Sequence, residues 1–312
     1  MCGAAAAQLQ DASRHACDPP RPRLALALAY VGDNDVSAAA LAIGALSLPD
    51  TASEAARYAA DQGVVLVGAA GDENAWHRNV PAGDSPFLFV KSIRANGRKE
   101  DGNATTYMAT WNCNNIGPRL DLSAPSDLCA TGATARIAGI AGLVKSAGRD
   151  HGSELSAGQV RALLRATADD INFSEADREE TGVFPAKEGW DAFHGYGRVN
   201  VGTAVEAVFD GVQVEQVTLA EPRWFAFSRE GAVRVRGEAS ASWVLEQGAG
   251  AEPSSWTEVA SGGAGTIDVD VTLSASDAEF ADLRRETTVL DRFAAAHQPL
   301  VQLRLHHRPM SP

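Results

Sequence analysis

The amino-acid sequence predicts an α/β domain followed by a small β domain. A continuous apolar run at residues 64–70 is typical of a parallel strand that is covered on both faces. Helical patterns alternate with such runs up to residue 211, as expected for a layered α/β domain. Beyond that point, segments such as residues 267–271 alternate apolar and polar side chains, which indicates half-exposed antiparallel strands.

The first domain is predicted to alternate helices and strands. A short helix at residues 24–32 is followed by a buried strand at 36–43. The next helix begins with a capping box at Thr51 and Glu54 and ends at Gly63. Strands at 64–70 and 87–90 follow, and then a helix at 132–147 that ends at Gly148. The last helix has one apolar face, because Ile137, Ile140 and Val144 follow helical spacing.

Two shorter helices are expected after these elements. Ser156 and Gln159 form a second capping box in front of the amphipathic segment VRALLRATA. Asn200 is a suitable N-cap for the segment VGTAVEAVF, because its side chain can accept a hydrogen bond from the first turn.

These patterns divide the chain into three parts. Residues 1–23 contain three prolines and no periodicity, and we predict a disordered or non-native leader. The first domain is placed at residues 24–211 and a β-sandwich-like domain at residues 212–312. A short helix is expected to interrupt the second domain at residues 276–297, where the sequence is polar and favours helix.

Composition narrows the function classes. Acidic residues outnumber basic ones by 40 to 27, which gives a net charge of −13. An acidic surface repels phosphate backbones, so nucleic acid is not an expected partner. We find no apolar stretch of bilayer length and no signal-peptide pattern, and the four cysteines do not have metal-ligand spacing. The sequence therefore predicts neither a membrane span nor a metal or other cofactor.

The predicted strand at residues 64–70 leads into the sequence AAGDEN. This segment resembles a signature of the subtilisin-like serine peptidases, or subtilases, in which a buried strand ends in Ala-Ala-Gly-Asn-Glu. The family continues with a Pro-Ala step, a short strand and a hydrophobic-Ala-Pro element. The corresponding segments of this chain are residues 81–82, 87–90 and 122–125.

The nucleophile motif of the family, Gly-Thr-Ser-Met-Ala-x-Pro-His-Val-Ala-Gly, begins a buried helix. Residues 129–139 (CATGATARIAG) resemble this motif in their closing Ala-Gly and in the apolar helix, and differ from it at the front. Further segments that match the family, in the expected order, are residues 155–168, 189–191 and 195–200.

The resemblance covers about residues 24–210. It implies a truncated subtilisin-like parallel sheet flanked by helices, and descent from a serine endopeptidase. Such an enzyme needs a Ser–His–Asp triad and an oxyanion hole. In the family, the Asp and His precede the part that matches here. The upstream residues Asp11, His15 and Asp18 lack the family's surrounding motifs, and we expect them to be exposed residues of the leader.

Thr131 stands at the position of the nucleophile, and Asp72 at that of the oxyanion-hole asparagine. A threonine hydroxyl attacks only when a base activates it. The alternative role for Thr131 is a helix N-cap. An ionised aspartate accepts hydrogen bonds and cannot donate one to an oxyanion unless it is protonated. We therefore predict that this isolated chain does not cleave peptides.

Substrate in the family lies against the ends of strands and forms backbone hydrogen bonds like an added strand. The matching substrate-binding positions are Ala45, Leu46 and Ser47 in one segment and Gly68, Ala69, Ala70 and Gly71 in another. For both segments, an ordinary buried strand and turn is an equal alternative.

Cysteines and histidines near these positions add two further expectations. Cys113 and Cys129 are a candidate disulfide that would pin the loop before the nucleophile helix, with two free thiols as the alternative. His77 follows two acidic residues, but the spacing fits no recognised metal site, so a surface loop is expected. His194 is expected to be structural.

Three functional hypotheses stay open. The first is a subtilase homologue with peptide or protein substrates, and by resemblance its location is extracellular or periplasmic. Such a homologue is either an inactive remnant or a fragment. The partner of a fragment would be the missing N-terminal part of its own catalytic domain. The second is a non-catalytic binding module that uses Trp224, Trp243 and Trp256, although these are expected to be core aromatics. The third is a gene fragment or frame-shifted reading frame, which the irregular leader and the ending HHRPMSP would fit.

Overall fold

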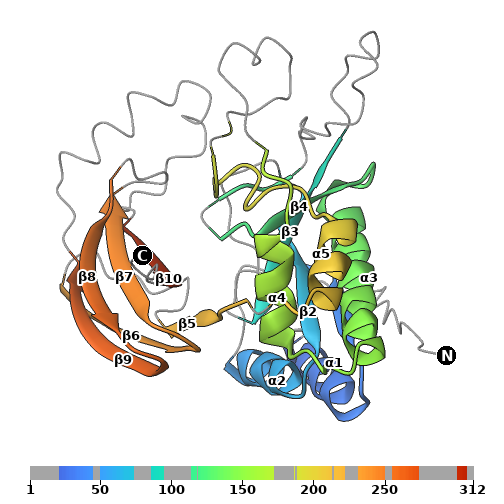
Figure 1. Ribbon diagram of the computed structural model, residues 1–312, viewed down its shortest axis with the longest axis horizontal. Coiled ribbons are helices and arrows are strands. Elements are labelled where there is room, and N and C mark those ends of the chain that lie inside the picture. Colours follow the sequence, from blue (N-terminus) through green and yellow to red (C-terminus); the bar gives the residue numbers. More distant parts are fainter. Residues whose placement is uncertain are drawn as a thin grey trace, which may run out of the picture. The chain divides into compact units, whose positions relative to one another are not determined.

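The computed structural model describes residues 21–44, 50–73, 86–94, 114–117, 119–171, 186, 188–212, 214–221, 231–249, 255–273 and 301–307. The chain divides into two compact units, Met1–Val214 and Glu215–Pro312 (Figure 1). The predicted helix at residues 276–297 lies outside the described residues. In the described part of the chain, no helix has the length and apolar character needed to cross a membrane.

A parallel sheet of four strands forms the centre of the first unit. The strands, in their order across the sheet, are β1 (Ala38–Leu41), β2 (Val65–Ala69), β3 (Phe87–Ile93) and β4 (Leu122–Pro125). Every residue of β2 and β3 is buried, which confirms that the apolar run at 64–70 is a strand covered on both faces. The strand predicted at 87–90 continues to Ile93.

Five helices accompany this sheet in the described residues: α1 (Arg21–Asp33), α2 (Asp50–Asp61), α3 (Cys129–Asp150), α4 (Ala157–Ala166) and α5 (Val201–Phe209). Side chains of β2 alternate between two apolar clusters. Val65 and Val67 pack with α3, α4 and α5, whereas Leu66 packs with α1 and α2. Figure 1 shows α3, α4 and α5 side by side on one face of the strands. The unit is therefore the layered α/β arrangement that the sequence predicts.

Local sequence explains several helix ends. Ser156 and Gln159 make both hydrogen bonds of a capping box at the start of α4, as predicted. Asn200 caps α5 by accepting a hydrogen bond from the backbone N–H of Thr203 at 3.1 Å. Ile137 lies on the buried face of α3, which confirms the predicted apolar stripe.

Three predicted helix boundaries are wrong. Helix α1 begins at Arg21, inside the predicted leader. Helix α2 begins at Asp50, so Thr51 lies within the helix instead of capping it. Gly148 does not end α3, because the helix continues to Asp150 and the chain turns at Gly152, whose φ is +78°. Gly148 is needed for space, since a Cβ there would lie 2.7 Å from the carbonyl oxygen of Ser153.

The second unit holds two antiparallel sheets of three strands each. One contains β5 (Val217–Glu221), β6 (Gly231–Ala239) and β9 (Gly265–Leu273), and the other β7 (Trp243–Ala249), β8 (Thr257–Gly262) and β10 (Val301–His307). Val235, Leu245 and Ile267 belong to one apolar cluster shared by both sheets. Trp243 is 5% exposed and part of this core, whereas Trp224 lies outside the described residues. A sandwich-like packing of the sheets stays a prediction.

Candidate functional site

The candidate site lies where the carboxyl ends of β2, β3 and β4 meet the beginning of α3. In parallel α/β sheets this edge is the usual place for ligands, because the loops that follow the strands gather there. Here the loop Gly71–Glu73 follows β2, Arg94 follows β3, and residues 126–128 connect β4 to α3. Of the two residues predicted for the catalytic machinery, Asp72 lies on the loop after β2 and Thr131 in the first turn of α3.

The N-terminus of α3 is arranged differently from the prediction. Leu128 is the N-cap residue, and its side chain makes no capping hydrogen bond. Thr131 lies two residues inside the helix and its side chain is exposed. The prediction that Thr131 caps α3 is therefore wrong, because the helix begins at Cys129 and other side chains take over the capping role.

Asp72 supplies the cap from another part of the chain. Its Oδ1 accepts a hydrogen bond of 2.9 Å from the backbone N–H of Ala130. This places a carboxylate at the positive end of the helix dipole, which is a stabilising arrangement. The N–H of Ala130 immediately precedes Thr131. The positive end of α3, which would attract a developing oxyanion, is thus already paired with a negative side chain.

A tight loop holds Asp72 in place. Gly71 has φ +103°, and a Cβ there would lie 2.4 Å from Nδ2 of Asn115. Asn115 donates from Nδ2 to the carbonyl oxygen of Ala70 at 3.0 Å and to the carboxylate of Glu73, and its backbone N–H donates to the carbonyl of Gly71. Sequence reasoning missed Asn115, because no local pattern marks a loop residue that bonds to a distant strand end.

The backbone of the predicted substrate-binding segment is largely engaged within the sheet. Gly68 and Ala69 pair with β3, and the N–H of Ala70 donates to the carbonyl of Val90 at 2.8 Å. Since Asn115 also uses the carbonyls of Ala70 and Gly71, a peptide at this segment would have to use other groups. The other predicted segment, Ala45 to Ser47, lies outside the described residues.

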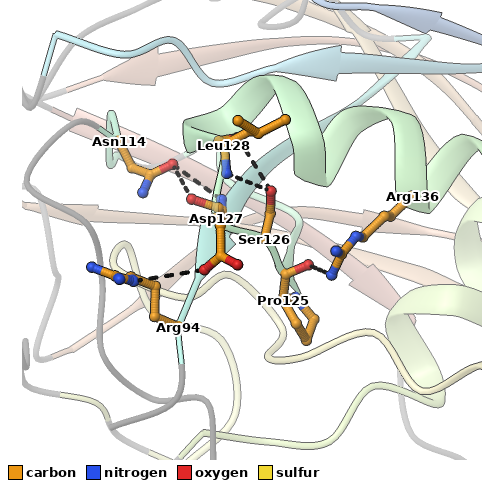
Figure 2. A network of polar contacts seen from close by, with 8 residues as sticks. Arg94, Asn114, Pro125, Ser126, Asp127, Leu128 and Arg136 are labelled. Atoms are coloured by element: carbon orange, nitrogen blue, oxygen red, sulfur yellow. Dashed lines mark hydrogen bonds and ion pairs between the residues drawn. The ribbon is translucent and has the colours of Figure 1, made fainter. Parts of the chain in front are cut away.

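A second polar network fixes the ends of β3 and β4 against α3 (Figure 2). Ser126 lies before the helix, and its Oγ accepts a hydrogen bond of 3.0 Å from the N–H of Leu128. Arg136 of α3 donates to the carbonyl of Pro125, as Figure 2 shows. The Nε of Arg94 lies 3.9 Å from Oδ1 of Asp127, which is 91% exposed. This ion pair therefore contributes little to stability. The network holds the backbone in position and does not form a reactive group.

The described residues bring no histidine to Thr131, and no hydrogen bond of its hydroxyl is found there. His194 is fully buried beside Lys91, and burial, with a smaller effect of the Lys91 charge, holds its pKa well below the usual range. This placement agrees with the structural role predicted for His194. His77 lies outside the described residues, within which no cluster of three or more potential metal ligands occurs.

Replacing Asp72 with alanine is expected to cost about 1 kcal/mol of stability, the usual cost of a lost cap. The N–H of Ala130 would lose its partner, and the helix dipole its nearby charge. Urea unfolding followed by circular dichroism measures the change. The matched control is Asp127→Ala, which removes an exposed carboxylate and should change the free energy of unfolding by less than about 0.5 kcal/mol. Equal effects of both substitutions would refute the capping role.

Cys129, the first residue of α3, is disulfide-bonded, and the other three cysteines lie outside the described residues. We keep Cys113 as the predicted partner. Thiol titration of the denatured chain should find Cys129 blocked until reductant is added, and peptide mapping should recover it linked to Cys113. Reduction should cost about 3 kcal/mol, because the bridge closes a loop of moderate length. Recovery of Cys113 as a free thiol would exclude this pairing.

Comparisons with known proteins agree with the resemblance to subtilases. No family model matches the chain. Thermitase of Thermoactinomyces vulgaris is 29% identical over 184 residues, which are 57% of this chain and 57% of thermitase. The chain thus spans little more than half the length of this relative.

Among solved structures, a prenylagaramide maturation protease aligns with a TM-score of 0.48 at 18% identity, over 60% of this chain and 67% of that one. A lanthipeptide protease aligns with a TM-score of 0.47 at 18% identity, over 60% and 66% of the two chains. Sphericase aligns with a TM-score of 0.45 at 20% identity, over 57% and 63%. The thermitase match, together with the motifs around β2 and α3, supports a subtilase-like family for part of the chain.

Proposed function

We propose that this chain is a subtilisin-like serine endopeptidase homologue that does not hydrolyse peptides on its own. The observation that carries the proposal is the hydrogen bond from the N–H of Ala130 to the carboxylate of Asp72, at the position where such an enzyme stabilises its oxyanion. A carboxylate there repels the negative charge that develops in acyl transfer. Loss of one oxyanion donor costs about 100-fold to 1,000-fold in rate.

The nucleophile position adds a second deficit. Thr131 has an exposed hydroxyl but no base bonded to it among the described residues. A hydroxyl without a base is protonated at neutral pH and is a weak nucleophile. The β-methyl group of threonine further restricts its rotamers compared with serine. The carboxylate of Asp72 and the missing base at Thr131 would each reduce the rate of peptide hydrolysis. Together they would abolish it.

Peptides or proteins are the proposed substrate class of the ancestral site, and an extracellular or periplasmic location is proposed by resemblance to secreted subtilases. The match to thermitase spans 57% of that protein, which supports a polypeptide equivalent to its unmatched part as the proposed partner. The alternative of a binding module in the β domain loses one of its proposed contacts, because Trp243 is buried in the core of its own unit.

Fluorophosphonate labelling of the purified, folded chain tests the proposal, with a fluorogenic peptide assayed in parallel. We expect neither labelling nor turnover, while thermitase under the same conditions should show both. The double variant Asp72→Asn, Thr131→Ser restores the family's residues at both positions and should still be inactive, because no base is supplied. Labelling of the natural chain at Thr131 with peptide turnover would overturn the proposal.

A further inference from the structure

Strand β1 lies at the end of the parallel sheet, and one of its edges has no neighbour among the described strands. Its two faces are nevertheless covered. Ala39 and Leu41 pack with α1 and α2, whereas Ala38 and Ala40 pack against the cluster that contains α3. Strands covered on both faces are typical of the interior of a parallel sheet, where each strand has a neighbour on either side. The free edge of β1 can therefore accept a further strand.

The hydrogen-bonding groups at this edge follow from the register of β1 on β2. The N–H of Val65 donates to the carbonyl of Ser37 at 3.1 Å, and Ala38 lies opposite Val65. Ser37, and with it every second residue, therefore directs its backbone groups towards β2, because successive residues of a strand face opposite edges. The N–H and C=O groups of Ala38 and Ala40 point to the free edge, where the described residues supply no hydrogen bond to them.

The sequence of β1 does not protect this edge. Natural edge strands are commonly blunted by charged side chains, prolines or bulges, which prevent pairing with other chains. The strand reads AAAL and pairs with β2 in an unbroken register. The nearest charged residue before the strand is Asp35, and the next one after it is Asp50. An edge without such protection is a template for pairing with another chain.

We propose that this edge is a dimer interface, at which β1 pairs antiparallel with β1 of a second copy of the chain. The edge is self-complementary under two-fold symmetry. An axis beside Ala39 sets Ala38 of each copy opposite Ala40 of the other, and each such pair exchanges two N–H···O hydrogen bonds. All the edge-facing groups of both residues are then bonded. The inference goes beyond the proposed function, because it involves neither Asp72 nor Thr131.

The surroundings of β1 suit a second copy in this orientation. The antiparallel register places Asp35 opposite Ile43 of the other copy, whereas a parallel register would set the two Asp35 carboxylates against each other, which is unfavourable. The same symmetry keeps α1 of both copies on one face of the joined sheet. Helix α1 exposes Leu26 and Tyr30, one turn apart and 68% and 65% exposed, so apolar side chains are available for contact on this face.

The oligomeric state of the purified full chain tests the interface. Sedimentation velocity over a concentration series should show conversion from the mass of one chain to twice that mass. Ala40→Pro removes one edge-facing N–H from each copy but none of the groups that bond to β2, and it should raise the dimer Kd at least about tenfold. Circular dichroism checks that this variant is folded. A natural chain that stays monomeric at every concentration overturns the proposal, as does a dimer that Ala40→Pro leaves unchanged.

Cysteine cross-linking tests the register without a proline in the strand. In the proposed dimer, Ala39 lies opposite its own copy in a non-hydrogen-bonded pair, where the Cα atoms are about 4.5 Å apart and a disulfide can form. Mild oxidation of Ala39→Cys should therefore give a covalent dimer that peptide mapping shows to be linked at this position. The matched control is Ala38→Cys, because its two copies lie diagonally, about 7 to 8 Å apart, and should not be linked. Equal yields of covalent dimer from the two variants would overturn the proposed pairing.

Discussion

Replacing Lys91 with methionine is expected to abolish most of the change in stability of the first unit between pH 7 and pH 10. Lys91 lies in the middle of β3 with no exposed surface, and no hydrogen-bond partner of its Nζ is found among the described residues. Burial lowers its pKa from 10.5 to about 7, and the nearby Asp191 opposes the shift. The native state therefore holds this amine largely neutral above neutral pH.

The sign of the pH dependence follows from proton binding. Between the native pKa of about 7 and the unfolded value of 10.5, the unfolded chain binds a proton at Lys91 that the native chain does not. Stability must therefore rise as the pH increases through this range, by up to about 1.4 kcal/mol per pH unit. Below pH 7 both states are protonated and this contribution levels off. The buried His194 also makes stability rise with pH, but only below its unfolded pKa of 6.5. The contribution of Lys91 is therefore best measured above pH 7.

Urea unfolding at a series of pH values measures this effect. The natural chain should gain about 4 kcal/mol between pH 7 and pH 10, and Lys91→Met should show a nearly flat profile. Lys145→Met is the comparison variant, because the Nζ of Lys145 donates to the carbonyl of Gly63 at 2.7 Å, and burial lowers the pKa of this amine less strongly than that of Lys91. That variant should keep most of the slope. An unchanged slope in Lys91→Met would show that another group titrates.

Local patterns predicted much of the fold because the chemistry behind them is local. The capping box at Ser156 and the N-cap at Asn200 each involve residues three positions apart, and both form as expected. The apolar run of β2 is continuous because both faces of that strand are covered. The end of β3 was predicted too early, because Lys91 and Ser92 interrupt the apolar run although both are buried.

The candidate site was harder to predict, since its contacts join distant parts of the chain. Resemblance to the family marked Asp72, but its bond to Ala130 spans 58 residues and has no signal in the local sequence. Asn115 was missed for the same reason, because it lies 45 residues along the chain from the carbonyl that it contacts. The periodic pattern predicted that helix α3 begins at residue 132, whereas the helix begins at Cys129. A Cβ at Gly132 would lie 2.1 Å from Oγ of Ser126, so this glycine allows close packing within the first turn.

Replacing Gly197 with alanine is expected to destabilise the first unit by about 3 kcal/mol or more. Gly197 has φ +114°, which side chains rarely adopt, and a Cβ there would lie 2.2 Å from the carbonyl oxygen of Asp169. The atom in the way belongs to the backbone, so relief requires the chain to move. Residue 198 forms bridges to both Ser123 of β4 and Asp169, and this pairing would be disrupted.

Gly211→Ala separates the two contributions to this cost. Gly211 has φ +68°, but within the described part of the chain no further atom lies within 4 Å of an added Cβ, so the substitution introduces backbone strain without a clash and should cost about 1 kcal/mol. Urea unfolding of both variants measures the difference. Similar losses in the two would show that the segment around Gly197 shifts freely. A much larger loss at Gly197 would mean that residues 197–199 are required for the stability of the sheet. These residues complete its edge beyond β4, because the carbonyl of Gly197 and the N–H of Val199 both bond to the backbone of Ser123.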